Sequence, residues 1–121
     1  MFTLRKIEGG RINVHEPLNY TVGATAVTEG QLLVLSSGVL VACGADVKPT
    51  FIALANGAAG ADIPVGRVEP NQVYETETAS GVSVGAKYKL NSTADGITNT
   101  AATTAGAEIV ALNGATVLVR F

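Results

Sequence analysis

With 121 residues, a net charge of −2 and only 15% charged side chains, the chain suffices for one small domain and lacks the basic clusters that neutralise nucleic-acid phosphates. A single cysteine, Cys43, excludes an internal disulfide, and one cysteine with one histidine does not make a protein-only zinc site. No apolar run approaches the ~20 residues of a membrane-spanning helix, and the charged start differs from a signal peptide. We therefore expect no cofactor, no metal, no nucleic-acid partner and no membrane partner.

The composition predicts an all-β protein. Fourteen glycines divide the chain into short runs rich in β-branched residues, and no amphipathic helical pattern is sustained between them. Apolar residues make up 47% of the chain, but aromatic residues only 5%, so the core is expected to consist of small side chains. The expected fold is a small β-barrel or sandwich of short antiparallel strands.

The first twenty residues differ from the remainder. Charged residues are concentrated there, Gly9–Gly10 and Pro17 interrupt any regular element, and the apolar positions are scattered. We expect an extended N-terminal arm over residues 1–20 and a single β domain over residues 21–121. The arm is either a frayed terminus followed by a first strand, or a segment that orders against a neighbouring subunit. In the second interpretation the contact residues are Ile12, Val14, His15, Leu18 and Tyr20.

Three hairpins are predicted in the β domain, each from two apolar runs that flank a turn signal. Asn-Gly and similar pairs adopt the positive φ angles of two-residue turns, and Asn113–Gly114 is expected to form one of type I′. The predicted pairs are 31–35 with 39–42, 87–90 with 97–98, and 108–112 with 115–121.

Two further strands are expected between these hairpins. Residues 63–68 contain Pro64, which cannot donate to a ladder, and are therefore expected at a sheet edge. Residues 73–77 alternate between apolar or Thr side chains and polar ones, which is typical of a half-solvated strand.

An internal repeat is a possible organising principle for these strands. Residues 27–37 resemble residues 82–92, about 55 positions later, because in both a glycine precedes a strand with alternating apolar residues. Residues 51–54 then occupy a place like that of residues 108–112. Two related β units that close on each other would produce this pattern, and so would ordinary strand patterning.

Candidate catalytic residues are few. His15 lies in the charged N-terminal segment, which favours a surface or interface histidine over a positioned base. Cys43 ends an apolar strand and is expected to be a buried, inert thiol. Glu75 and Glu77 share one strand face at roughly 7 Å, a spacing compatible with glycosidase or cation-binding chemistry, although a solvated strand face is the simpler interpretation. We expect no enzyme.

Residues 29–42 carry a resemblance to a known family. Together with residues 49–55 and 115–121, this stretch resembles the opening hairpin, next strand and closing strand of the small capsid decoration, or cement, proteins of tailed bacteriophages. Glu29–Gly30–Gln31 stands where those proteins have Pro-Gly-Asp, and the charged segment before residue 20 has no counterpart in them.

The resemblance implies a structural protein of the virion exterior, assembled in the host cytoplasm. Its partner would be the major capsid protein of the expanded head, whose neighbouring subunits it would bridge and stabilise. Self-association, as a trimer at local threefold positions, is a further expectation. The alternatives are a glycan- or receptor-binding β module of a phage fibre or adhesin, another assembly component, and a small hydrolase that uses Glu75 and Glu77.

Overall fold

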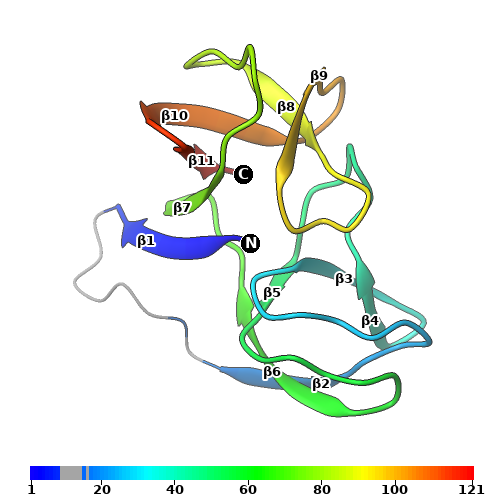
Figure 1. Ribbon diagram of the computed structural model, residues 1–121. Coiled ribbons are helices and arrows are strands. Elements are labelled where there is room, and N and C mark those ends of the chain that lie inside the picture. Colours follow the sequence, from blue (N-terminus) through cyan, green and yellow to red (C-terminus); the bar gives the residue numbers. More distant parts are fainter. Residues whose placement is uncertain (9–14, 16) are drawn as a thin grey trace.

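The computed structural model describes residues 1–8, 15 and 17–121, and it confirms the all-β fold (Figure 1). Eleven strands in the described part of the chain form two antiparallel sheets. No helix is found among these residues, and therefore none long and apolar enough to cross a bilayer.

The six-stranded sheet occupies the upper part of Figure 1 and the five-stranded sheet the lower part. In spatial order, the six strands are β1 (Thr3–Ile7), β7 (Gln72–Glu77), β11 (Thr116–Arg120), β10 (Ala107–Asn113), β8 (Lys87–Leu90) and β9 (Ile97–Ala101). The five are β2 (Leu18–Thr21), β6 (Asp62–Arg67), β5 (Phe51–Ala53), β3 (Leu32–Ser36) and β4 (Val39–Ala42).

The two sheets repeat one topology. The spatial order β2-β6-β5-β3-β4 becomes β7-β11-β10-β8-β9 when each strand is replaced by the one five places later along the chain. All of these pairings are antiparallel. Strand β1 is the single addition, paired with β7 at the edge of the second unit. The chain therefore consists of two related β units.

Backbone hydrogen bonds outside the ladders repeat in the same register. The N–H of Gly30 donates to the carbonyl of Ala53 at 2.9 Å, and the N–H of Gly85 donates to that of Ile109 at 2.9 Å. Both glycines have left-handed backbone angles, with φ of 81° and 87°, which side chains rarely tolerate. Since Gly30 and Gly85 are 55 residues apart, the spacing of the sequence match is also that of equivalent structural positions.

Each unit has its own apolar interior. Phe51 and Ala53 of β5 face the interior of the first unit, and Ile52 between them faces the second. The interior of the first unit contains Val22, Val27, Leu33, Leu40, Phe51, Ala53, Ile63 and Val65. The second is built on Tyr74, Tyr88, Leu90, Ile97, Ala107, Ile109, Val117 and Val119, and it also takes in Phe2, Leu32, Cys43, Ile52, Val68 and Ala94. Leu32 of β3 and Ile52 of β5 thus belong to the first sheet but pack in the interior of the second unit, and this contact joins the two units.

All three predicted hairpins are confirmed, as β3–β4, β8–β9 and β10–β11. The expected turn at Asn113–Gly114 is shifted by one residue. Asn113 pairs with Thr116, so the loop is Gly114–Ala115, and only Gly114 has a positive φ, which is the pattern of a type II′ turn. The type I′ pattern occurs instead at Ser37–Gly38, where φ is 51° and 81°.

The expectation that Pro64 marks an edge strand is wrong, because β6 lies between β2 and β5. The short length of β5 explains why proline is tolerated. The last ladder pair of β5 and β6 is Ala53 with Val65, and beyond it the N–H of Leu54 donates to the carbonyl of Pro64 at 3.0 Å. The missing N–H of Pro64 thus falls past the end of β5, where no ladder bond is lost.

The strand expected at residues 73–77 is confirmed as β7, but it is not half-solvated. It lies between β1 and β11, and Gln72, Val73, Tyr74 and Thr76 are buried. Its neighbour β1 and the first strand of the other sheet, β2, contain the two ends of the expected arm. The boundary drawn at residue 20 falls inside β2, and residues 9–14 and 16 lie outside the described residues.

Candidate functional site

Of the five residues expected to contact a partner, Ile12 and Val14 lie outside the described residues. Leu18 and Tyr20 project from β2 towards the interior of their own unit. The Tyr20 ring packs against Phe51 with 4.9 Å between ring centroids. The described contacts of Leu18 and Tyr20 are therefore internal, and a role in partner binding stays a prediction.

His15 is half-buried and connects the two sheets. Its ring stacks on Tyr74 at 6.0 Å between centroids, and it lies so close to Gly66 that a Cβ at that position would be 2.2 Å from its Cγ. The Tyr74 hydroxyl donates to Gln72 Oε1 at 2.7 Å, so its contact with His15 Nε2 at 3.3 Å requires His15 to be the donor. Burial lowers the pKa of His15.

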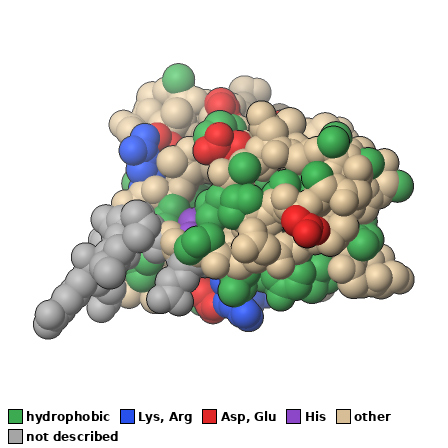
Figure 2. All heavy atoms as spheres, turned by 90° about the horizontal axis from the view of Figure 1, so that it is seen from below, with side chains coloured by type: hydrophobic (Ala, Val, Ile, Leu, Met, Phe, Trp, Pro, Cys, Tyr) green, Lys and Arg blue, Asp and Glu red, His purple; other side chains and the backbone are tan. Residues whose placement is uncertain are grey.

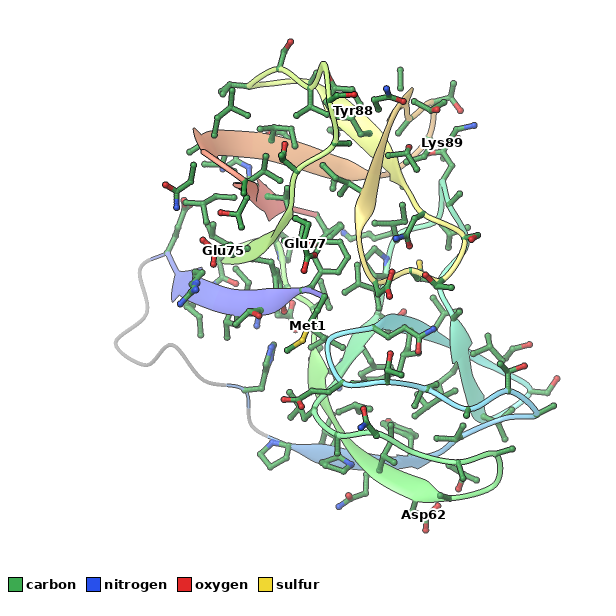
Figure 3. All side chains as sticks on the ribbon, viewed as in Figure 1. Met1, Asp62, Glu75, Glu77, Tyr88 and Lys89 are labelled. Carbon is green, nitrogen blue, oxygen red and sulfur yellow. The ribbon has the colours of Figure 1, made fainter. Side chains whose placement is uncertain are left out.

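Glu75 and Glu77 are both engaged in ion pairs (Figure 3). Arg5 on β1 donates two N–H bonds to Glu75, and the Met1 ammonium group is 2.8 Å from Glu77. The Arg5 hydrogen bonds lower the pKa of Glu75, and the bond from the Met1 ammonium lowers that of Glu77. A glycosidase acid requires a raised pKa, so the direction of both shifts is opposite to that role.

Cys43 is buried, as expected, with 3% of its surface exposed. Its Sγ donates to the carbonyl of Val47 at 3.2 Å, and burial raises the pKa of the thiol to about 11. A thiol of this kind is protonated at neutral pH and reacts slowly. Within the described ranges, no three His, Cys, Asp or Glu side chains gather closely enough to hold a metal ion.

A cleft of about 460 Å³ lies where loops of both units meet. This volume is within the range of pockets that bind small ligands or single side chains. Three basic side chains and one acidic side chain line the cleft, together with Phe121 and two prolines. The lining residues are Lys48, Pro49, Pro70, Lys87, Thr104, Ala105, Gly106, Glu108, Arg120 and Phe121.

One wall of this cleft is fixed by Asp46. Its carboxylate, on the loop between β4 and β5, accepts the Thr103 hydroxyl and the backbone N–H groups of Thr103, Thr104 and Ala105. These bonds, with the Thr103 hydroxyl foremost, hold the pKa of Asp46 well below its usual range. Because the two loops occupy equivalent places in the two units, Asp46 ties the units together beside the cleft.

The unpaired lysines of the described chain are concentrated at this cleft. Each of the three described arginines, Arg5, Arg67 and Arg120, is within 4 Å of a carboxylate. None of the described lysine side chains, Lys48, Lys87 and Lys89, has such a partner among the described residues. Lys48 and Lys87 line the cleft, and Lys89 follows on the same strand as Lys87.

Sequence reasoning missed the cleft residues. Lys48, Lys87 and Arg120 come from three segments that lie more than 30 residues apart, and none stands in a basic run. The repeat was the only available signal, because it predicts that equivalent loops of two packed units lie near each other. Compared with known proteins, the chain matches no family model and no curated protein.

Proposed function

We propose that the protein is a structural component of a tailed-phage head, which binds the outer surface of the expanded shell and stabilises it by bridging neighbouring subunits of the major capsid protein. The observation that carries the proposal is the doubled architecture. A protein that bridges two like subunits needs two like contact regions, and two β units of one topology supply them.

The equivalent strands β4 and β9 support the bridging role. Each is the terminal strand of its sheet, with one ladder partner among the described residues; the outer edge of β4 also carries the isolated bridge of Leu40 with Val22, whereas no bridge is found on the outer edge of β9 in the described part of the chain. An edge strand offers unpaired backbone groups to which another chain can add a strand. One such edge in each unit gives the protein two places at which to contact neighbouring subunits.

The character of the surface also supports a structural role. Figure 2 shows a face on which charged side chains form a few small groups and hydrophobic side chains are spread between them. Large hydrophobic side chains are exposed in both units, among them Leu35 in the first and Leu112, at 55% exposure, in the second. The low share of charged residues, 15% of the chain against about 25% in typical soluble domains, suits a protein that is packed against others.

The alternative of a glycan-binding module has less support. All six aromatic side chains lie within the described residues, and none of them is in the exposed class. Phe2, Phe51, Tyr74 and Tyr88 are buried, and Tyr20 and Phe121 are half-buried. A sugar-binding groove requires exposed aromatic rings on which the sugar stacks.

Co-sedimentation tests the proposal. The purified protein is mixed with expanded shells stripped of decoration, and with unexpanded shells, of the phage that encodes it. Saturable pelleting with expanded shells alone, together with a raised melting temperature of those shells, is the expected result. A protein that stays in the supernatant with every particle would refute the proposal.

Two edge variants and a matched control sharpen the test. Lysine on an edge strand opposes the addition of another strand. Val41→Lys on β4 and Asn99→Lys on β9 are each expected to weaken pelleting, whereas Ser80→Lys, at an exposed loop position outside both strands, is expected to pellet as the wild type does. Equal pelleting of all three variants would exclude the edges as contact regions.

A further inference from the structure

The cleft between the two β units carries an inference that rests on the proposed function and names the chemistry of the partner. We propose that this cleft binds an acidic side chain, or a short acidic segment, of the partner protein. The partner group would be the carboxylate of an Asp or Glu, seated between Lys48 and Lys87 and facing Arg120.

Charge is the first argument for a carboxylate ligand. The chain as a whole is acidic, yet three of its eight basic side chains line this one cleft with a single acidic side chain. That carboxylate, Glu108, is 3.0 Å from Arg120 Nη2 and is therefore already committed to an ion pair. Lys48 and Lys87 have no acidic partner among the described residues, which leaves their charge available to a ligand.

The rigidity of the walls is the second argument. Residues 104–106 form one wall, and Asp46 accepts the backbone N–H groups of Thr104 and Ala105. Phe121, which also lines the cleft, packs its ring edge-on against Phe2 and Tyr74, with centroids 5.7 and 6.0 Å apart. A cleft whose walls are held by internal contacts loses little conformational entropy when a ligand enters.

The distribution of the other cations disfavours a nucleic acid. A polynucleotide needs a row of basic side chains that follows its backbone. Beyond the cleft and the adjacent Lys89, the described basic side chains are Arg5 and Arg67, and both are paired with carboxylates. The free positive charge thus matches one or two carboxylates and does not extend into a track.

The direct test uses a peptide probe and the full chain. Amide chemical shifts are followed by NMR while acetylated, amidated hexaglutamate is added, with hexaglutamine as the uncharged control. Saturable shifts are expected at Lys48, Lys87 and residues 104–106 with hexaglutamate only, and they weaken as salt is raised because the charges lie near the surface. The absence of saturable shifts, or stronger binding by an oligothymidylate of matched charge, would overturn the proposal.

Variants that change the charge of the cleft are expected to shift the affinity for hexaglutamate in opposite directions. Lys48→Gln and Lys87→Gln are each expected to weaken binding about two- to fivefold, as for exposed charge pairs. Glu108→Gln removes the competing carboxylate and is expected to tighten binding. Lys89→Gln is the matched control, since it removes the same charge from the same strand outside the cleft lining, and it is expected to leave binding unchanged. An equal loss in Lys87→Gln and Lys89→Gln would show a diffuse charge effect and overturn the proposal.

Pelleting with expanded shells separates this inference from the proposed function. If the wild type pellets and the Lys48→Gln/Lys87→Gln double variant pellets equally well, the cleft is not the contact and the inference fails alone. If the wild type does not pellet with any shell, the proposed function fails, and the peptide titration still decides whether the cleft binds carboxylates.

Discussion

Gly30 contacts the start of β1, and we expect that replacing this glycine with alanine weakens the packing of β1 on the second unit and lowers the stability of the protein. Gly30 has a φ of 81°, and its carbonyl accepts the N–H of Phe2 at 3.0 Å. A Cβ at this position would lie 2.9 Å from the Phe2 carbonyl oxygen and 2.3 Å from Met1 Cγ. The Met1 side chain can turn away, but the backbone of Phe2 can move only if the start of β1 moves.

The cost of Gly30→Ala has two components. Alanine in a left-handed conformation costs about 1–2 kcal/mol, partly offset by about 0.4–1 kcal/mol because alanine reduces the entropy of the unfolded chain. Displacing Phe2, whose side chain is 1% exposed, adds the ~1–3 kcal/mol typical of overpacked sites. The components sum to about 1–5 kcal/mol, against the total of about 5–15 kcal/mol by which natural domains are stable.

Comparison of Gly30→Ala with Gly60→Ala isolates the second component, the overpacking of Phe2. Gly60 also has a φ of 81°, but a Cβ there would meet no atom within 4 Å, so it has the backbone cost alone. Gly85→Ala, at the position equivalent to Gly30 in the second unit, has a φ of 87° and also no neighbour within 4 Å. Both controls are expected to be destabilised by about 1–3 kcal/mol less than Gly30→Ala, because neither overpacks a neighbour.

Urea unfolding followed by tyrosine fluorescence measures these differences, since the chain contains no tryptophan and Tyr74 and Tyr88 are buried. The slope of free energy against urea should be similar in all variants, so that midpoints report stability. If Gly30→Ala and Gly60→Ala were destabilised equally, the contact of Gly30 with the start of β1 would have no energetic weight, and the reasoning would be refuted.

Three further predictions concern titratable groups. Cys43 should react with a thiol reagent at pH 8 about a hundredfold more slowly in the folded protein than an exposed thiol, because burial raises its pKa from 9.0 to about 11; equal rates in buffer and in urea would contradict this. The folded pKa of Asp46 is depressed, so its contribution to stability is present above its unfolded pKa of about 3.9 and is lost as the pH falls below that value. Urea midpoints measured from about pH 5 to about pH 2.5 should therefore fall less steeply with pH in Asp46→Asn than in the wild type. The NMR titration of His15 should give a pKa below about 6.5, and stability should decline as the pH falls through that value because the unfolded chain binds the proton more tightly; a pKa above it would show that the ring is not buried.

The two-unit architecture was visible in the sequence because a single local requirement recurs. Gly30 and Gly85 each precede a strand and need a left-handed backbone, so glycine, the alternating strand and the returning strand appear twice at the same spacing. The turn at Gly114 and the interior position of Pro64 were not predictable in this way. Both depend on where the partner strand ends, which is set by tertiary pairing and not by the local residues.

The candidate cleft lay beyond sequence reasoning for a related reason. Lys48 is in a loop, Lys87 begins β8 and Arg120 ends β11, and each is unremarkable in its own segment. Their proximity follows from the packing of one unit on the other, for which Asp46 is a visible determinant only after the fold is known. The N-terminal residues were predicted to contact a partner because their composition is unusual, and composition does not indicate which residues line a cleft.

The two units also protect the same sheet edge by different means, and they differ there in one side chain. In the first unit the chain leaving β2 meets β4 through a bridge of Val22 with Leu40, and the N–H of Gly23 donates to the Leu40 carbonyl at 2.9 Å. A Cβ on Gly23 would be 3.0 Å from that oxygen, so the approach is accommodated most easily by glycine.

In the second unit the equivalent position is Ala79. The equivalence follows from the preceding residues, since Val22 donates to Ala61 as Thr78 donates to Ala115. With a methyl group at this position, the described residues form no bridge between β7 and β9, and the free edge of β7 is instead covered by β1. Unpaired edges invite association with other chains, so each unit must close this one. The first does so within itself, and the second with β1, a strand from the start of the chain that belongs to the sheet farther from it in sequence.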